Sequence, residues 1–163
     1  MIFALGVGCR ATEALSVDWS AVDLEERRAV LQITKRSNGA VAQYVELPPV
    51  VVQALSSLPH REGAVFRTRL PGVKTNGEPI PLGERFRDVE SGGGQFKSGW
   101  AGACARAGLP GKWTVYPSGG RRYVPEVTPH DTRHIWASWH YEVHRDLLRL
   151  RDEGGWGTAR MVE

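Results

Sequence analysis

His130 and Arg133 are the residues whose types and spacing most clearly indicate chemistry on an anion. They follow Thr128, a good helix N-cap, and Pro129, which suits the first helical position. Residues at this spacing share one helix face, and the first turn of a helix offers unpaired backbone N–H groups and the positive end of the helix dipole. The pair therefore predicts a phosphate site. The alternative for so short a motif is a first turn exposed to solvent.

Histidines on the same segment offer a rival interpretation, a zinc site. His130 pairs with His134 at helical spacing, and His140 pairs with His144. The step from His134 to His140 turns a helix by about 600°, so the two pairs point about 120° apart and form no single tetrahedral site. Asp131 is also shorter than the Glu of a zinc-protease motif. We therefore expect no metal and no other cofactor, with His140 and His144 on the surface.

Positive charge is concentrated in two stretches of the chain, although the net charge is only +3. Residues 95–125 carry five Lys and Arg and no acid, and residues 61–76 carry four against Glu62 alone. A basic surface facing a polyanion is one interpretation, and solvated positive loops are the other. Charge alone does not separate them.

Length and composition place the chain among globular domains. Its 163 residues suit one domain, and 41% hydrophobic and 24% charged residues exclude wholesale disorder. No apolar run is long enough for a membrane span, and the N-terminus does not look like a signal peptide, so we expect a cytoplasmic protein. Cys9 and Cys104 lie outside any metal or disulfide pattern and are expected to be buried as small hydrophobes.

Periodicity predicts an α+β fold, mainly helical with a small antiparallel sheet. The expected helices begin near Arg10, at Pro48, at Gln95, after Thr128 and at Leu147. The expected strands, residues 29–34 and 44–47, form a hairpin around Asn38 and Gly39. Glycine and proline make residues 67–94 and 109–127 irregular. The face expected to be buried in the helix after Thr128 consists of Ile135, Trp136, Trp139 and Val143.

Taken in order, several short elements resemble the catalytic domain of the tyrosine recombinases, the phage integrase family. The resemblance covers nearly the whole chain and depends on the order and spacing of these elements more than on any one of them. They are Gly8-Cys-Arg10-Ala-Thr-Glu13-Ala-Leu15-Ser-Val-Asp-Trp19, Val22-Asp23-Leu24, Thr34-Lys35, Phe96-Lys-Ser-Gly-Trp100, Arg106-Ala-Gly-Leu109, His130-Asp-Thr-Arg133-His134, Ala137-Ser-Trp139 and Gly155-Trp156.

The resemblance implies a site that breaks and rejoins DNA through a 3'-phosphotyrosine. Arg10 and Arg133 match the two arginines whose guanidinium forks stabilise charge on the pentavalent phosphorus. His130 matches the residue that hydrogen-bonds the phosphate and accepts the proton of the nucleophile. Lys35 matches the general acid for the departing 5'-oxygen, with Arg36 as its alternative.

The same resemblance extends to further residues. Trp156 takes the place of a His or Trp that donates its ring N–H to the phosphate, although simple packing is the alternative for this side chain. The residues expected to support the site are Glu13, Asp131 and His134. Those expected to bind DNA are Arg36, Lys97, Arg106, Arg121 and Arg122.

The nucleophile is the departure from the family pattern. The resemblance implies a tyrosine that lies just beyond Glu163, and Tyr44, Tyr116, Tyr123 and Tyr141 do not occupy that place. We therefore interpret residues 1–163 as a partial integrase catalytic domain without the N-terminal DNA-binding domain and the C-terminal tyrosine segment.

As given, the chain is expected to bind double-stranded DNA weakly and not to cleave it. The resemblance implies a DNA-bound homotetramer for the full-length protein. The alternatives are a DNA-binding remnant of an integrase with no activity, and a metal-bound or purely structural domain.

Overall fold

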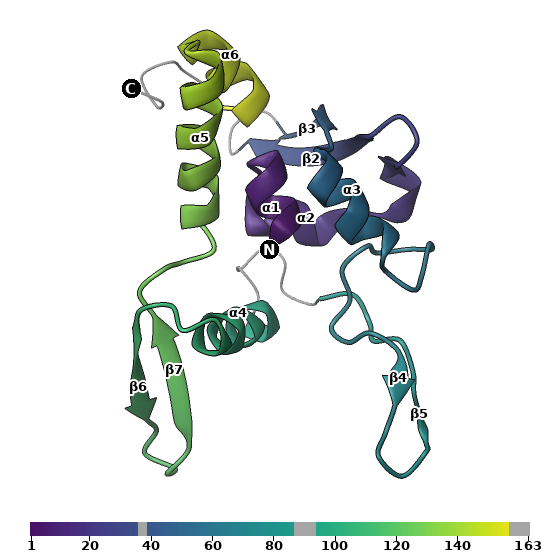
Figure 1. Cartoon of the computed structure of the whole chain (residues 1–163), viewed down its shortest axis with the longest axis vertical. Helices are drawn as coiled ribbons and strands as arrows, with labels where there is room; N and C mark the ends of the chain where they lie inside the picture. Colours follow the sequence, from purple (N-terminus) through teal and green to yellow (C-terminus); the bar gives the residue numbers. More distant parts are fainter. Residues whose placement is uncertain (36–38, 87–93, 157–163) are drawn as a thin grey trace.

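A computed structural model describes residues 1–35, 39–86 and 94–156 (Figure 1). The elements of the N-terminal part are α1 (Ile2–Val7), α2 (Ala11–Ser16), a 3-10 helix (Trp19–Ala21), β1 (Val22–Asp23), β2 (Arg28–Lys35), β3 (Gly39–Glu46) and α3 (Pro49–Ser56). Those that follow are β4 (Gly72–Val73), β5 (Pro79–Ile80), α4 (Gly94–Arg106), β6 (Gly111–Val115), β7 (Arg121–Pro125), α5 (Asp131–His144) and α6 (Leu147–Gly154). The predicted α+β class, mainly helical with small antiparallel sheets, is confirmed.

The largest sheet is antiparallel, in the order β1-β2-β3. In β2, Ala29, Leu31 and Ile33 alternate along one face and are buried, as expected for a strand with one face on the core. The predicted hairpin between residues 29–34 and 44–47 is confirmed, with Ala29 opposite Val45. Asn38, part of its predicted turn, lies outside the described residues.

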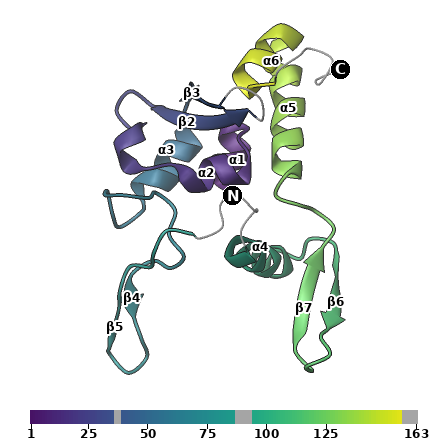
Figure 2. The same ribbon diagram turned by 180° about the vertical axis from the view of Figure 1, so that it is seen from behind.

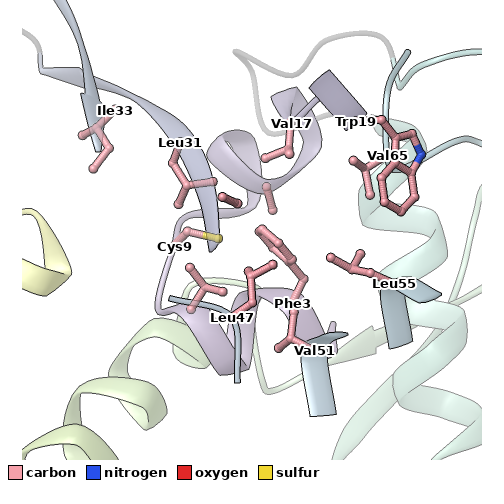
Figure 3. Close-up of a cluster of buried hydrophobic side chains, with 13 residues drawn as sticks. Phe3, Cys9, Val17, Trp19, Leu31, Ile33, Leu47, Val51, Leu55 and Val65 are labelled. Carbon is pink, nitrogen blue, oxygen red and sulfur yellow. The ribbon is translucent and has the colours of Figure 1, made fainter. Parts of the chain in front are cut away.

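The main hydrophobic core is built from the N-terminal elements alone. Phe3 of α1, Leu31 of β2 and Val51 of α3 meet at its centre (Figure 3). Every member of this cluster among the described residues lies between Phe3 and Val65. The later helices therefore dock against a body whose core is already complete without them.

Two hairpins extend from the body in the same direction (Figures 1 and 2). One joins β4 to β5, so residues 67–94, predicted to be irregular, include a short paired segment. The other joins β6 to β7, so the prediction that residues 109–127 are irregular was wrong. Its glycines, with Gly119 at φ 84°, form the turn between two strands of alternating β-branched, aromatic and polar residues.

The face that α5 buries differs from the predicted one. Ile135, Trp139 and Val143 are 40%, 59% and 75% exposed, and Thr132, Arg133 and His140 are buried in their place. Trp136, the fourth residue of the predicted face, is half-buried and stacks on Trp156. Arg133 and His140 have their partners on other elements, which an apolar stripe cannot indicate. Thr132 is held locally, since its hydroxyl donates to the carbonyl oxygen of Pro129 at 2.7 Å.

The exposed side of α5 faces a groove. Trp139 and Val143 line it together with Leu5 of α1, and its volume is about 870 Å³. The apolar stripe of α5 is therefore turned toward this groove and solvent.

His140, predicted to lie on the surface, is instead buried against α6, where its Nε2 lies 2.7 Å from Glu153 Oε2.

Cys9 and Cys104 are both buried and form no disulfide, as predicted. Across the described ranges, no helix has the length and apolar content needed to cross a membrane.

Candidate active site

Arg10 lies at the junction of α1 and α2, where Glu13 holds it. The Arg10 backbone N–H donates to Glu13 Oε2 at 2.7 Å, and its Nη1 donates to Oε1 at 2.6 Å. The Glu13 side chain is only 5% exposed, whereas that of Arg10 is 39% exposed. The buried carboxylate therefore fixes the base of an arginine that still reaches solvent.

Arg133 lies in the first turn of α5 and joins three parts of the chain. It is 2% exposed. Its Nη1 donates to the carbonyl oxygen of Gly8, at the end of α1, at 2.7 Å. Its Nη2 donates to the carbonyl oxygen of Gly154, at the end of α6. A guanidinium has five N–H donors, so three remain after these two bonds.

Trp156 covers the guanidinium of Arg133. The Arg133 Cζ lies 4.2 Å from the centre of the Trp156 ring, and that ring stacks on Trp136 with centroids 6.1 Å apart. The resemblance implied that the indole N–H points at a phosphate. In this structure the face of the ring contacts Arg133, which is a cation–π contact.

His130 immediately precedes α5 and is exposed. Its ring packs edge-on against that of His134, with centroids 4.8 Å apart. Asp131 supports the turn and not the imidazole, because its carboxylate accepts from the Thr128 N–H at 2.6 Å and from the Thr128 hydroxyl at 3.1 Å. The hydrogen bond from the Thr128 N–H is the main reason that the pKa of Asp131 is lowered. Both bonds run from Thr128 to Asp131, and α5 begins at Asp131 with His130 as its N-cap and no side-chain cap. The prediction that Thr128 is the N-cap was therefore wrong, although Thr128 is bonded to the first turn.

Arg10 lies close enough to His130 and Arg133 for its positive charge to lower the pKa of both. Burial lowers the pKa of Arg133, the positive charge of Arg10 lowers it further, and Glu13 opposes both. Burial likewise lowers the pKa of His130, followed by the positive charges of His134, Arg133 and Arg10. The structure thus brings together residues from the two ends of the chain around one positive position.

The other predicted residues fall into two groups. Lys35 ends β2, and only its backbone, paired with Gly39, is described. That end of β2 lies beside the site, since Ile33 Cδ1 is 2.9 Å from where a Cβ on Gly155 would lie. Arg36 lies outside the described residues. The predicted DNA-binding residues Lys97 and Arg106 on α4 and Arg121 and Arg122 on β7 are all exposed.

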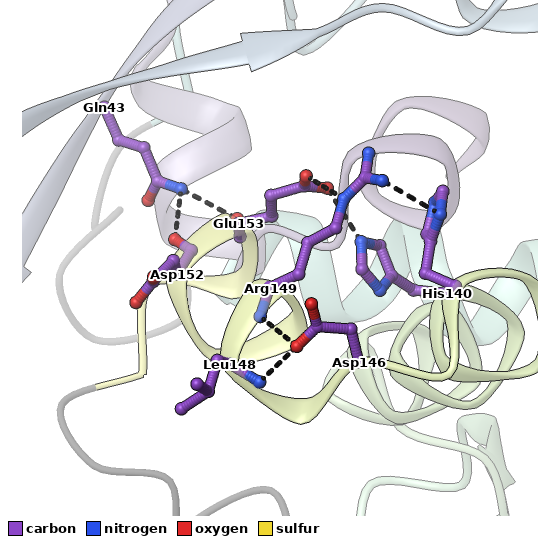
Figure 4. Close-up of polar contacts among 8 residues, drawn as sticks. Gln43, His140, Asp146, Leu148, Arg149, Asp152 and Glu153 are labelled. Atoms are coloured by element: carbon purple, nitrogen blue, oxygen red, sulfur yellow. Dashed lines mark hydrogen bonds and ion pairs between the residues drawn. The ribbon is translucent and has the colours of Figure 1, made fainter.

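A polar cluster that sequence reasoning missed holds α6 in place (Figure 4). Gln43 of β3 donates its Nε2 to the carbonyl oxygens of Asp152 and Glu153, at 3.2 and 2.7 Å. Glu153 accepts from Arg149 Nε at 2.6 Å and from His140 Nε2 at 2.7 Å. These bonds fix the end of α6 that supplies Gly154 to Arg133. The spacing of Arg149 and Glu153 is a local signal, whereas the contacts of Gln43 and His140 arise only in the fold.

The four tyrosines of the sequence all lie in described segments, and three of them have side-chain contacts elsewhere. Tyr44 is exposed on β3, and Tyr141 lies under the guanidinium of Arg145. Tyr116 accepts from Arg122 Nη1 at 3.5 Å, and Tyr123 donates to the carbonyl oxygen of Leu109.

The zinc alternative also finds no site in the described part of the chain. There, no three His, Cys, Asp or Glu side chains come together in a way that could hold a metal ion.

Comparison with known proteins gives a consistent result at the level of fold. A search of protein-family models finds no match. The integrase of Salmonella phage P22 is 24% identical over 162 residues, which is 98% of this chain and 36% of that protein. The chain therefore spans about a third of the length of this curated relative.

Solved structures of recombinases share the fold. The XerA recombinase matches with a TM-score of 0.61 and 18% identity, over 98% of this chain and 48% of that one. The Tn1549 transposon integrase, solved with circular intermediate DNA, matches with a TM-score of 0.56 and 16% identity, over 99% and 51%. The catalytic domain of bacteriophage HP1 integrase matches with a TM-score of 0.56 and 17% identity, over 98% and 67%. The predicted resemblance to tyrosine recombinases is confirmed, and the chain has the fold of their catalytic domain.

Proposed function

We propose that this domain supplies the phosphate-activating part of a site-specific DNA recombinase, which breaks and rejoins double-stranded DNA through a 3'-phosphotyrosine. The observation that carries the proposal is the meeting of Arg10, His130 and Arg133, with Trp156 over Arg133. The similarity to integrases and recombinases supports the substrate class.

The two arginines stabilise the charge that develops on phosphorus. Arg10 reaches solvent and offers its guanidinium directly. Arg133 has three N–H donors left after its bonds to Gly8 and Gly154, and its buried guanidinium adds positive charge to the phosphate site. Because these backbone bonds fix Arg133 before the substrate arrives, little reorganisation is needed in the transition state.

His130 and Lys35 handle the protons. The lowered pKa of His130 keeps the imidazole neutral near pH 7, so it can accept the proton of the attacking tyrosine hydroxyl. As the tyrosine oxygen bonds to phosphorus, the bond to the 5'-oxygen breaks, and Lys35 protonates that oxygen, with Arg36 as the alternative donor. We assign Trp156 to covering Arg133 with its ring face, which limits the access of water to the guanidinium.

The attacking tyrosine is proposed to come from outside these 163 residues, because Tyr116, Tyr123 and Tyr141 have contacts elsewhere and Tyr44 is exposed on β3. Binding to double-stranded DNA, and assembly of the full-length protein into a DNA-bound homotetramer, are part of the same proposal.

Covalent trapping on nicked duplexes of randomised sequence tests the proposal. The 163-residue chain should form no adduct that survives denaturation, and a chain extended through the next tyrosine of its reading frame should form one. In the extended chain, Arg133→Ala should lower adduct formation by about a hundredfold or more, the usual effect of removing one transition-state donor. Arg28→Ala, at an exposed position paired with Glu26, is the control and should have no effect. An extended chain that binds DNA but stays inert would refute the enzymatic role.

A further inference from the structure

The β6–β7 hairpin carries a basic and aromatic surface that the proposed site does not use. Lys112, Arg121 and Arg122 are exposed on it, and none of them forms an ion pair with a described residue. Trp113 and Tyr116 are 59% and 46% exposed on the same hairpin. Between Gly111 and Pro125 there is no acidic residue. Exposed aromatic side chains grouped on one surface and rimmed by polar residues are typical of an interaction site.

The hairpin is held in one conformation by its own contacts. Its strands pair in continuous register, from Gly111 opposite Pro125 to Val115 opposite Arg121. The Trp113 ring packs edge-on against Tyr123, with centroids 5.3 Å apart, and Arg121 Cζ lies 5.9 Å from the centre of the Trp113 ring. The hairpin is therefore a preformed ribbon, and a partner does not need to order it.

Its base is tied close to the candidate active site. Trp100 of α4 donates its Nε1 to the carbonyl oxygen of Val127 at 2.9 Å, and the chain continues from there directly to His130. The hairpin extends away from this anchor, beyond the body of the domain (Figures 1 and 2). A molecule bound at His130 would thus have the hairpin beside it.

We propose that the β6–β7 hairpin enters a groove of duplex DNA next to the reacting phosphate, an inference that rests on the proposed function. A two-stranded ribbon fits the major groove, which is about 12 Å wide. Lys112, Arg121 and Arg122 contact backbone phosphates, and Trp113 and Tyr116 make apolar contacts within the groove.

The second hairpin shows why DNA, and not another protein, is the partner of the first. In β4–β5 the exposed Lys74 is neutralised by Glu78, whose carboxylate lies 2.6 Å from its Nζ. The β6–β7 hairpin is also a two-stranded antiparallel ribbon, but its Lys112, Arg121 and Arg122 form no ion pair with any described residue. Arginine and aromatic residues are common in protein interfaces too, so it is the unbalanced positive charge that favours DNA, because surfaces that bind DNA are much more positive than those that bind proteins.

The salt dependence of duplex binding tests the proposal. Replacing Lys112, Arg121 and Arg122 together with Ala should weaken binding and reduce the slope of log K against log salt by about 2–3, because each lost phosphate contact removes about 0.9. The matched control removes the same charge from ion-paired positions, Lys74, Arg145 and Arg151, and should leave the slope nearly unchanged. Fluorescence anisotropy of a labelled duplex over a range of salt concentrations measures both.

Trp113→Ala separates apolar contact from charge. It should weaken binding several-fold without changing the salt slope, and Trp113→Phe, which keeps a ring against Tyr123, should restore most of the loss.

Three outcomes would overturn the hairpin inference. If the parent chain binds duplex and the triple variant binds with an unchanged slope, the inference fails while the proposed function stands. If the parent shows no salt-dependent binding at all, both fail. If the triple variant changes only the sedimentation of the protein, the hairpin is a protein interface.

Discussion

His130 is placed where its surroundings oppose protonation. Partial burial and the charges of His134, Arg133 and Arg10 lower its pKa below the ordinary 6.5. Arg10→Ala should therefore raise the pKa of His130, and Arg28→Ala should not change it. Titration of the His130 ring protons by NMR measures both. If the two variants give the same pKa as the parent, Arg10 does not share the site with His130.

The same shift has a defined effect on stability. Between the lowered pKa and 6.5, the unfolded chain binds the His130 proton more readily than the folded one. The free energy of unfolding should therefore fall as the pH drops through 6.5, and His130→Gln should remove part of that fall. Urea unfolding at a series of pH values measures the difference.

Glu13 is the acid that balances the two arginines. Glu13→Ala leaves Arg10 without its hydrogen-bonded partner and next to Arg133, so we expect a loss of roughly 2–3 kcal/mol of stability. Glu25→Ala, at an exposed position, is a control of equal charge. Chemical denaturation compares them. Equal losses would contradict the role assigned to Glu13.

At this scale the sequence predicted contacts between near neighbours. The pairing of Arg10 with Glu13 and the turn before Arg133 follow from spacing alone. The burial of Arg133 could not be predicted from spacing, because the carbonyl groups that accept its hydrogen bonds, those of Gly8 and Gly154, are distant in the chain.

Helices were easier to predict than the faces they bury. The starts of α2, α3, α4 and α6 follow from capping residues and periodicity. The buried face of α5 was mispredicted because polar residues with tertiary partners replaced the apolar stripe. The β6–β7 hairpin was mistaken for irregular chain because its glycines and proline were given more weight than the strand-forming residues on either side.

The end of α6 depends on a side chain from β3. Gln43→Ala removes two hydrogen bonds to the carbonyls of Asp152 and Glu153, a loss of about 1–2 kcal/mol. Gln32→Ala, exposed on β2, is the matched control. Hydrogen exchange should show faster exchange of the Trp156 amide, which donates to Arg151, in the first variant only. Equal exchange in both variants would mean that α6 is held without Gln43.

The whole molecule consists of a body with its own core and a C-terminal part docked on it, with α5 packed against α1. The core cluster ends at Val65, whereas Arg133 and Gln43 join the two parts through backbone carbonyls. Arg10 comes from the body, and His130 and Arg133 come from the docked part. The candidate site therefore lies at this joint, and its geometry depends on the docking.

Gly8 is the position at which the docking can be tested. Its φ is 70°, and a Cβ there would lie 2.2 Å from the Trp136 ring of α5. Gly8→Ala should therefore cost more than the roughly 1 kcal/mol of a left-handed alanine, because the side chain also pushes α5 away and disturbs the bond from Arg133. Gly108→Ala is the control, since its φ is 66° and no atom lies within 4 Å of the new Cβ.

Hydrogen exchange distinguishes undocking from general unfolding in these two variants. In Gly8→Ala the amides of α5 and α6 should lose protection while those of β2 and β3 keep it, because the core that holds the sheet does not include the later helices. In Gly108→Ala protection of α5 and α6 should be nearly that of the parent. If Gly8→Ala lowers protection uniformly across the sheet and the helices, the two parts unfold as one unit, and the candidate site does not lie at a separable joint.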